Sequence, residues 1–395
     1  VATGAEMAIV AATDCAAKSI PYLIIVAGGF GETGEDGALR EARLQEIANR
    51  SGTRILGPNS LGIFVPGERL DTIFVEHGDK ALGPGGGVAF ITQSGSVGVE
   101  ALGLASNAGY GMRAFVGLGN KCDLDELDFL DYFGRDPQTT CLAFYLENIS
   151  HGRRFLEKAR QVTPHKPVIV LKAGRTPSGA RAVSSHTGRL AGMDAVVNGA
   201  FRQYGIQRVI DDEELCDASK GLAMLPPAQG PRVAVLTPAG GFGVMCADYV
   251  EAGQRGVPLS MATLAPQTVR NIREATFPFA ACENPVDLTA SADDGMFGRS
   301  LDALLEDDGV DIVICTAFFA PPAISDGLIQ EIANRARRSS KPIITFTQYG
   351  PFTDLYLRRF HDAGVVGFPS ISRAVRAARF LVERARILAA LEEHP

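Results

Sequence analysis

Two passages of this sequence combine a buried strand, a glycine-rich turn and the start of a helix. The first reads VAFITQSGSVGV at residues 88–99, and the second reads VAVLTPAGGFGV at residues 233–244, at a constant offset of 145 positions (233 − 88 = 145). Such a turn directs bare backbone N–H groups and the positive end of the helix dipole at one point, which suits a phosphate group. Two such turns in one chain predict an anion that is handled from two sides.

One of the six histidines, His186, lies in a small, polar segment, AVSSHTG at residues 182–188. We interpret this segment as a mobile loop. A neutral imidazole is nucleophilic near pH 7 and can carry a phosphoryl group for a short time. The alternative is an incidental histidine beside a helix N-cap, with Ser185 or Thr187 as the capping residue. The two anion-binding turns favour the first interpretation.

A nucleophilic histidine needs an acceptor for its second ring nitrogen, and Glu147 is the candidate. Glu147 follows the apolar run at residues 141–146, so it lies at the carboxyl end of a predicted strand, where open α/β sheets bind ligands. The alternative is a solvated loop carboxylate or a helix-entry residue. Lys172 and Arg175 follow another strand and either neutralise phosphate or serve as surface charges.

These residues are positioned by an alternation of strands and helices, which predicts parallel sheets covered on both faces. The repeat extends beyond the turns, because KPVIVLKAG at 166–174 is similar to KPIITFTQYG at 341–350. We therefore expect an α/β protein with two successive domains of similar plan. The expected strands of the first 230 residues lie at 21–27, 53–56, 88–92, 114–117, 141–146 and 168–172.

Composition narrows the class of protein. The net charge of −7 argues against a nucleic-acid-binding protein, which needs a basic face. The seven cysteines are scattered and lack CxxC spacing, which indicates reduced thiols in a cytoplasmic protein and no metal site. We find no apolar run long enough to span a bilayer and no signal peptide, so we expect no membrane partner.

Two common nucleotide motifs do not fit. The glycines at 28–31 lack the GxGxxG spacing of a dinucleotide fingerprint, which leaves a nicotinamide-dependent dehydrogenase as a remote alternative. The sequence also has no GxxxxGK[ST] phosphate loop. The turn Asn284-Pro285-Val286-Asp287 suggests no chemistry of its own, since Asn-Pro starts turns and Asp287 can fix one.

Taken together, the motifs resemble those of the NDP-forming acyl-CoA synthetases, which are related to the succinyl-CoA synthetase α subunit. They span nearly the whole chain in family order, and the set is far more specific than any single member. The motifs that carry the resemblance are GGFGE at 28–32, GPNSLG at 57–62, QSG at 93–95, GNKCD at 119–123, YLE at 145–147, KAGR at 172–175, SHTG at 185–188, GG at 240–241 and NPVD at 284–287.

The resemblance implies a partial Rossmann-like CoA-binding domain at 1–82, followed by two flavodoxin-like parallel α/β ligase domains, the phosphohistidine domain at 83–227 and a second one at 228–395. It implies the reversible reaction of acyl-CoA, phosphate and ADP to acid, CoA and ATP, through an acyl phosphate and a phosphohistidine. CoA and phosphate are then ligands of this chain, and ADP or ATP with Mg²⁺ binds to an ATP-grasp partner.

The resemblance also assigns roles to single residues. His186 takes the phosphoryl group and Glu147 orients its imidazole. It assigns phosphate binding to Ser94, Gly95, Ser96, Gly240 and Gly241. It assigns the binding of CoA or a small carboxylic acid to Gly29, Phe30, Pro58 and Asn59.

Two departures from the family pattern shape what we expect of this chain. The family's opening strand and glycine loop have no counterpart, so we expect them to precede Val1. No ATP-grasp domain is visible, so we expect it on a separate subunit or elsewhere in the natural protein. The alternative function is a non-catalytic, acyl-CoA-sensing module of a protein lysine acetyltransferase. An unpaired sheet edge also leaves homo-oligomer formation open.

Overall fold

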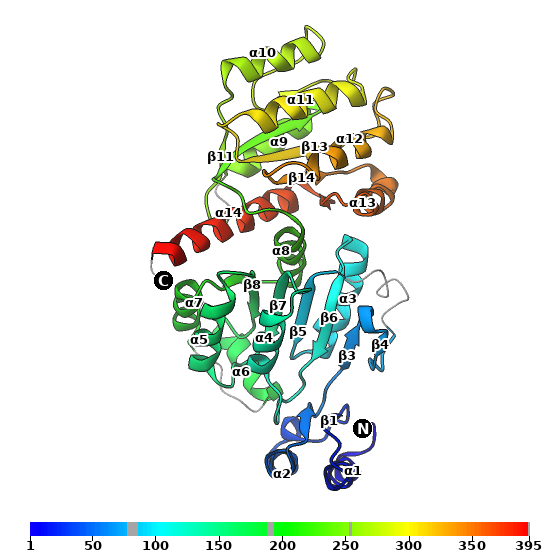
Figure 1. The fold of residues 1–395 in the computed structure, drawn as a ribbon, viewed down its shortest axis with the longest axis vertical. Coiled ribbons are helices and arrows are strands. Elements are labelled where there is room, and N and C mark those ends of the chain that lie inside the picture. The colour runs from blue at the N-terminus through cyan, green and yellow to red at the C-terminus, as the bar shows by residue number, and fades with distance from the viewer. Residues whose placement is uncertain (77–85, 188–192, 253–254, 394–395) are drawn as a thin grey trace. The chain divides into compact units, whose positions relative to one another are not determined.

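The chain divides into two compact units, one formed by Val1–Ser106 with Gly111–Ser219 and the other by Asn107–Tyr110 with Lys220–Pro395. The computed structural model describes residues 1–76, 86–187, 193–252 and 255–393, and it describes only the backbone of residues 106–108 and 184–187. In both units, helices cover sheets of mainly parallel strands (Figure 1). The sequence predicts three domains, and the first two of them share the first unit.

The first unit opens with a small α/β layer in which two helices pack beside a two-stranded parallel sheet. Helix α2 ends at Gly52, whose φ of 75° is favourable for glycine and closes the helix in a left-handed cap. The elements of this layer are α1 (Ala5–Ala17), β1 (Tyr22–Ile24), the 3₁₀ turn η1 (Gly31–Thr33), α2 (Glu35–Ser51) and β2 (Arg54–Leu56).

A seven-stranded sheet forms the rest of the first unit, in the order β4-β3-β6-β5-β7-β8-β9. The pairs β3–β4 and β3–β6 are antiparallel and the other pairs are parallel. The strands are β3 (Gly62–Val65), β4 (Leu70–Asp71), β5 (Val88–Thr92), β6 (Met112–Gly117), β7 (Cys141–Leu146), β8 (Val168–Lys172) and β9 (Gln207–Val209). The helical elements are η2 (Pro66–Glu68), α3 (Gly95–Ala108), α4 (Glu126–Arg135), α5 (Gly152–Val162), α6 (Pro177–Thr187), α7 (Asp194–Gln203) and α8 (Asp212–Met224).

Strands β3 and β4 belong to this larger sheet, although residues 62–71 fall in the first of the three predicted domains. Gly62 of β3 lies opposite Gly117 of β6. The close pairing depends on that second glycine, because a Cβ on Gly117 would lie 2.9 Å from atoms of Leu61. The chain therefore passes from the small layer into the large sheet before residue 83, where the second of the predicted domains begins.

The second unit contains a six-stranded parallel sheet in the order β11-β10-β13-β14-β15, with β12 paired to β10. The strands are β10 (Arg232–Thr237), β11 (Ser260–Met261), β12 (Val286–Asp287), β13 (Ile312–Thr316), β14 (Ile343–Phe346) and β15 (Gly367–Phe368). The helical elements are α9 (Gly240–Glu251), α10 (Pro266–Ala275), α11 (Asp294–Glu306), α12 (Gly327–Ala336), η4 (Gly350–Phe352), α13 (Thr353–Asp362) and α14 (Ile371–Glu393).

Both large sheets have apolar interiors. Every residue of β5, β8 and β13 is buried, as expected for strands covered on both faces. Six of the seven cysteines are buried, and all seven thiols are free. In the part of the chain that the structure describes, no helix has the length and apolar character needed to cross a bilayer.

Candidate functional site

The turn between β5 and α3 has the geometry of an anion-binding helix start. The Ser94 N–H donates to Thr92 Oγ1 at 3.1 Å, and the Thr92 hydroxyl donates to the Ser94 carbonyl at 2.8 Å. Ser94 Oγ accepts from the Val97 N–H at 3.4 Å, so its side chain caps the helix. Gly95 and Ser96 are exposed at this helix start. Their backbone N–H groups are the kind that bind phosphate at helix N-termini.

The turn between β10 and α9 repeats this geometry. The Ala239 N–H donates to Thr237 Oγ1 at 3.0 Å, and the Thr237 hydroxyl donates to the Ala239 carbonyl at 2.9 Å. No side-chain hydrogen bond caps α9. A Cβ on Gly241 would meet no atom within 4 Å, so the backbone there is open to a ligand. Gly240, by contrast, lies close to the Asp287 carboxylate.

The duplication is also visible at the amino ends of the strands, away from the two glycine turns. The Lys166 ammonium donates to the Asp136 carbonyl at 2.5 Å, and the Lys341 ammonium donates to the Asp307 carbonyl at 2.7 Å. Burial lowers the pKa of both lysines, and the neighbouring aspartates partly offset this effect. The similarity of the two KP-containing segments in the sequence therefore reflects the same lysine contact in both units.

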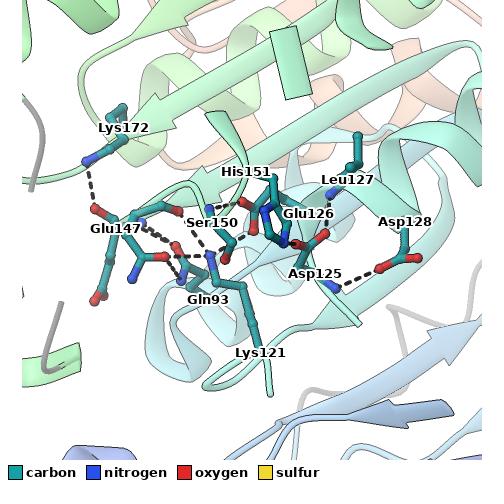
Figure 2. A network of polar contacts seen from close by, with 11 residues as sticks. Gln93, Lys121, Asp125, Glu126, Leu127, Asp128, Glu147, Ser150, His151 and Lys172 are labelled. Carbon is teal, nitrogen blue, oxygen red and sulfur yellow. Dashed lines mark hydrogen bonds and ion pairs between the residues drawn. The ribbon is translucent and has the colours of Figure 1, made fainter. Parts of the chain in front are cut away.

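Glu147 lies directly after β7, at the carboxyl edge of the seven-stranded sheet, and is 5% exposed. Its backbone N–H donates to Gln93 Oε1 at 2.6 Å, and its carbonyl accepts from the Lys172 ammonium at 2.6 Å (Figure 2). Its carboxylate accepts from the Tyr145 hydroxyl at 3.5 Å. Because β5 and β7 are neighbours, the sheet brings Glu147 beside Gln93, which directly precedes Ser94.

Two groups beside Glu147 have shifted pKa values. Burial, together with the negative charge of Glu147, raises the pKa of Tyr145 to about 12. Burial lowers the pKa of Lys172, and Arg208 lowers it further, although Asp194 and Glu147 partly offset both effects. Lys172 is 5% exposed and donates to two backbone carbonyls, so it supports the loop after β7 rather than standing as a surface charge.

A second buried lysine, Lys121, lies next to the same loop. Its ammonium donates to Glu126 Oε2 at 2.7 Å, to Asn148 Oδ1 at 2.6 Å and to the Asn148 carbonyl at 3.1 Å. Gln93 completes the network, since its Oε1 accepts from the Asn148 N–H at 3.0 Å and its Nε2 donates to Asn148 Oδ1 at 3.3 Å. Figure 2 shows this network around Glu147 and Lys121.

His186 lies in the last turn of α6, so the prediction of a loop over residues 182–187 is wrong for the backbone. Thr176 starts this helix, because its Oγ1 accepts from the Gly179 N–H at 3.1 Å. Ser185 lies inside α6 and does not occupy an N-cap position. The side chain of His186 and residues 188–192 lie outside the described part of the chain. Helix α6 contacts η1, so its backbone passes beside the glycine turn of the small layer.

The glycine turn before η1 is held by carboxylates. Glu32 Oε1 accepts from the Gly29 N–H at 2.6 Å and the Phe30 N–H at 3.2 Å, and Glu32 Oε2 accepts from Asn120 Nδ2 at 2.6 Å. Burial alone would raise the pKa of Glu32, but these hydrogen bonds, led by that of Asn120, lower it overall. Asn120 also accepts from Asn59 Nδ2 at 3.4 Å.

The four predicted CoA or substrate residues lie in different environments. Gly29 has a φ of 96°, which suits glycine, and is partly exposed. The ring of Phe30 is fully buried in the core of the small layer, so only its backbone can face a ligand. Pro58 is also buried, whereas Asn59 is exposed beside Asn120.

Family models match most of the chain. Residues 85–222 match the family described as succinyl-CoA ligase like flavodoxin domain, and residues 233–379 match the ligase-CoA domain. The chain is 35% identical to the alpha subunit of acetate–CoA ligase [ADP-forming] II of Pyrococcus furiosus, over 94% of this chain and 80% of that one. The chain belongs to the ADP-forming CoA ligases. The resemblance inferred from the sequence motifs is thereby confirmed.

Other members of the family are similar over the same region. Acetate–CoA ligase [ADP-forming] I of Archaeoglobus fulgidus is 36% identical over 96% of this chain, which spans 53% of that protein. A structure of Ca. Korarchaeum cryptofilum dinucleotide forming acetyl-coenzyme A synthetase 1, in complex with phosphate and ADP, has a TM-score of 0.88 and 30% identity, and the match covers 99% of this chain and 83% of that one. The predicted α/β fold with flavodoxin-like ligase domains is confirmed, and these relatives give no support to the sensing module.

Within the ligase family fold, the two units differ at one informative position. The strand pairings place Cys141 opposite Val88 and Ile312 opposite Val233, so Phe318 is the counterpart of Glu147. The Phe318 ring packs edge-on against Phe242 and Tyr349, with ring centroids 5.3 Å and 5.9 Å apart. The second unit therefore keeps the turn and replaces the carboxylate with an aromatic cluster.

The NPVD motif of the second unit makes hydrogen bonds that hold the local backbone, including the turn contact that the sequence predicts for Asp287. Asn284 Oδ1 accepts from the Val235 N–H at 2.9 Å, and its Nδ2 donates to the carbonyls of Val233 and Ala262. Asp287 Oδ1 accepts from the Thr289 N–H at 2.9 Å and fixes the turn after β12.

The sequence reasoning did not assign roles to Gln93, Lys121, Asn120 and Asn148. Gln93 and Lys121 are 28 positions apart (121 − 93 = 28), and only the pairing of β5 with β6 brings their loops together. The sequence did mark three of these residues, because Gln93 lies in the motif QSG and Asn120 and Lys121 lie in the motif GNKCD. The described residues contain no cluster of histidine, cysteine or acidic side chains suited to a metal ion.

Proposed function

We propose that this ADP-forming CoA ligase chain catalyses the CoA and phosphate half-reaction and then carries the phosphoryl group on His186. Phosphate attacks the thioester carbonyl of a small acyl-CoA, the C–S bond breaks and CoA leaves as a thiolate. The His186 imidazole next attacks phosphorus of the acyl phosphate, and the P–O bond breaks to release the carboxylate. Transfer of the phosphoryl group to ADP completes the reaction.

The single observation that supports this proposal most is the position of Glu147. It lies at the carboxyl edge of the sheet beside the β5–α3 turn, with its backbone fixed by Gln93 and Lys172. A carboxylate held there can accept the ring N–H of a histidine and keep the opposite nitrogen available for phosphorus. The Pyrococcus and Archaeoglobus relatives are named as ADP-forming ligases, and the resemblance of the sequence motifs implies a phosphohistidine in that reaction.

The proposed phosphate ligands are the backbone N–H groups and hydroxyls at Ser94, Gly95 and Ser96, with a second set at Gly240 and Gly241. Each set lies at the N-terminus of a helix of more than ten residues, where the dipole favours an anion. For CoA or the acid we propose the Gly29 and Phe30 backbone, the edge of Pro58 and the side chain of Asn59.

The nucleotide step requires a partner. The Pyrococcus relative is named as an alpha subunit, and the Korarchaeum synthetase binds phosphate and ADP. We propose that an ATP-grasp subunit or domain holds ADP or ATP with Mg²⁺ for this chain, and that the complex works in the cytoplasm. We divide the chain into CoA-binding residues 1–82 and ligase domains at 83–227 and 228–395.

Labelling tests the proposal. The chain is incubated with an ATP-grasp partner of the family and ATP labelled on its terminal phosphate. We expect acid-labile label on this chain at His186, its loss in His186→Ala and a much slower appearance in Glu147→Gln. Label that persists in His186→Ala would refute the proposed carrier, and label at an unchanged rate in Glu147→Gln would refute the role of the carboxylate.

A further inference from the structure

Lys121 is an unusual residue to bury. The side chains of Lys121 and Glu126 are both 0% exposed, and their charges lie 2.7 Å apart. A buried ion pair contributes little net stability, because desolvation of two charges offsets their attraction. The backbone of Lys121 also has a φ of 61°, a left-handed conformation that side chains rarely adopt. Stability alone therefore does not account for a lysine at this position.

The contacts of Lys121 lead to Glu147 in two steps. The ammonium binds both oxygens of Asn148, the residue next to Glu147. Gln93 then bridges the pair, because its Oε1 accepts from the N–H groups of both Glu147 and Asn148. These bonds fix the backbone of the loop after β7, and with it the origin of the Glu147 side chain (Figure 2).

The other end of the network is anchored to a helix. Glu126 is the first residue of α4, and a capping box formed by Asp125 and Asp128 fixes that helix start. Glu126 Oε1 accepts from the Ser150 N–H at 2.6 Å, so the carboxylate holds a further point of the loop that carries Glu147. The loop is thus held at residues 147, 148 and 150 by the side chains of Gln93, Lys121 and Glu126, in addition to the contact of Lys172 with Glu147.

We propose that Lys121, acting through Asn148 and Gln93, is a positioning residue that sets the Glu147 carboxylate for phosphoryl transfer to the histidine. This inference rests on the proposed function. Lys121 touches no reacting group, since its side chain is fully buried. Its effect is geometric: a shift of about 1 Å at a catalytic group can reduce a rate by about 10²-fold.

The test removes the network without leaving a buried charge. In the double variant Lys121→Met/Glu126→Gln both charges disappear together, and glutamine keeps an oxygen for the Ser150 N–H. We expect a folded chain whose His186 is phosphorylated about 10²-fold more slowly than in the wild type. The control is Lys166→Met, which removes a lysine that is only partly buried and donates to two carbonyls, those of Phe133 and Asp136, and this variant should label at the wild-type rate.

A double-mutant cycle on the labelling rate distinguishes a positioning role from a general loss of structure. If Lys121 acts through Glu147, then adding the double variant to Glu147→Gln should slow labelling no further, because the carboxylate is already lost. Losses that multiply would show an independent structural effect and overturn the proposal. If the double variant does not fold, Gln93→Met breaks the same chain of bonds without touching a charge, and it should show the same slow labelling and the same lack of additivity.

The outcomes distinguish this inference from the proposed function. No label on the wild-type chain overturns both. Label on the wild-type chain that is lost in His186→Ala, with the double variant and Gln93→Met both within about twofold of the wild-type rate, overturns the positioning role alone. A loss in the double variant that is absent from Lys166→Met and does not add to Glu147→Gln supports it.

Discussion

Of the two glycines at the start of α3, Gly95 and Gly98, Gly98 is the more tightly packed. A Cβ at this position would lie 2.6 Å from Phe115 Cζ and 2.9 Å from Thr92 Cγ2. Both neighbours are fully buried, and the Phe115 ring stacks on Phe90 with centroids 6.0 Å apart. Because the ring is buried and stacked, we expect an added methyl group to displace either the ring or the start of α3.

The expected cost of Gly98→Ala follows from two opposing terms. Overpacking a core by one methyl group costs about 1–3 kcal/mol. Alanine in place of glycine inside a helix returns about 0.5–1 kcal/mol. We therefore expect a net loss of about 1 kcal/mol in the free energy of unfolding, the difference between the middle values of these two ranges. Gly95→Ala is the matched control, since the nearest atom to its Cβ is Leu61 Cδ1 at 4.0 Å and its stability should change by less than about 0.5 kcal/mol.

Urea denaturation followed by circular dichroism measures both variants. The midpoint should fall for Gly98→Ala and stay near the wild-type value for Gly95→Ala, with unchanged slopes that show the same surface exposed on unfolding. A Gly98→Ala chain as stable as the wild type would refute the reasoning, because it would mean that Phe115 can move without cost. Equal losses in both variants would show that the Phe115 contact is not the cause of the loss.

Two further predictions concern ionisation. Tyr145 should stay protonated up to about pH 12, and Glu147→Gln should lower its pKa only in part, because burial is the larger cause. The ultraviolet signal of tyrosinate, with Tyr145→Phe subtracted, measures this, and an ordinary pKa near 10 would contradict it. Arg232→Met should destabilise the fold by about 1–3 kcal/mol at pH 7, because the buried Asp311 loses its charged partner. Although burial raises the pKa of Asp311, the Arg232 hydrogen bonds lower it overall, so this contribution is present above about pH 4 and is lost as the pH falls through the lowered value. Unfolding curves across pH should show the two proteins converging in acid, and a constant gap would contradict the assignment.

The sequence was most informative where apolar runs are long. The predicted strands at 88–92, 141–146 and 168–172 coincide with β5, β7 and β8, because runs of four to six consecutive apolar residues leave little ambiguity. Short strands such as β12 (Val286–Asp287) and β15 (Gly367–Phe368) carry no such run and depend on pairing with their neighbours.

The candidate site was predictable only in part. Glu147 follows an obvious strand, so its place at the sheet edge could be inferred. The helical backbone around His186 could not, because AVSSHTG has small polar residues and no apolar periodicity. The network of Gln93 and Lys121 depends on loops that the order of the strands brings together. No local sequence pattern predicts that order, so the network could not be inferred.

Because Phe318 stands in the second unit where the first unit has Glu147, the two copies of this arrangement differ in their chemistry. The β10–α9 turn keeps main-chain donors and a helix dipole, neither of which titrates at physiological pH. With an aromatic cluster where the first copy has Glu147, the carboxylate beside this turn is that of Asp287, which lies next to Gly240 and comes from a different strand position. The proposed role of orienting a histidine therefore belongs to this strand position in the first copy alone, and the two turns are not interchangeable.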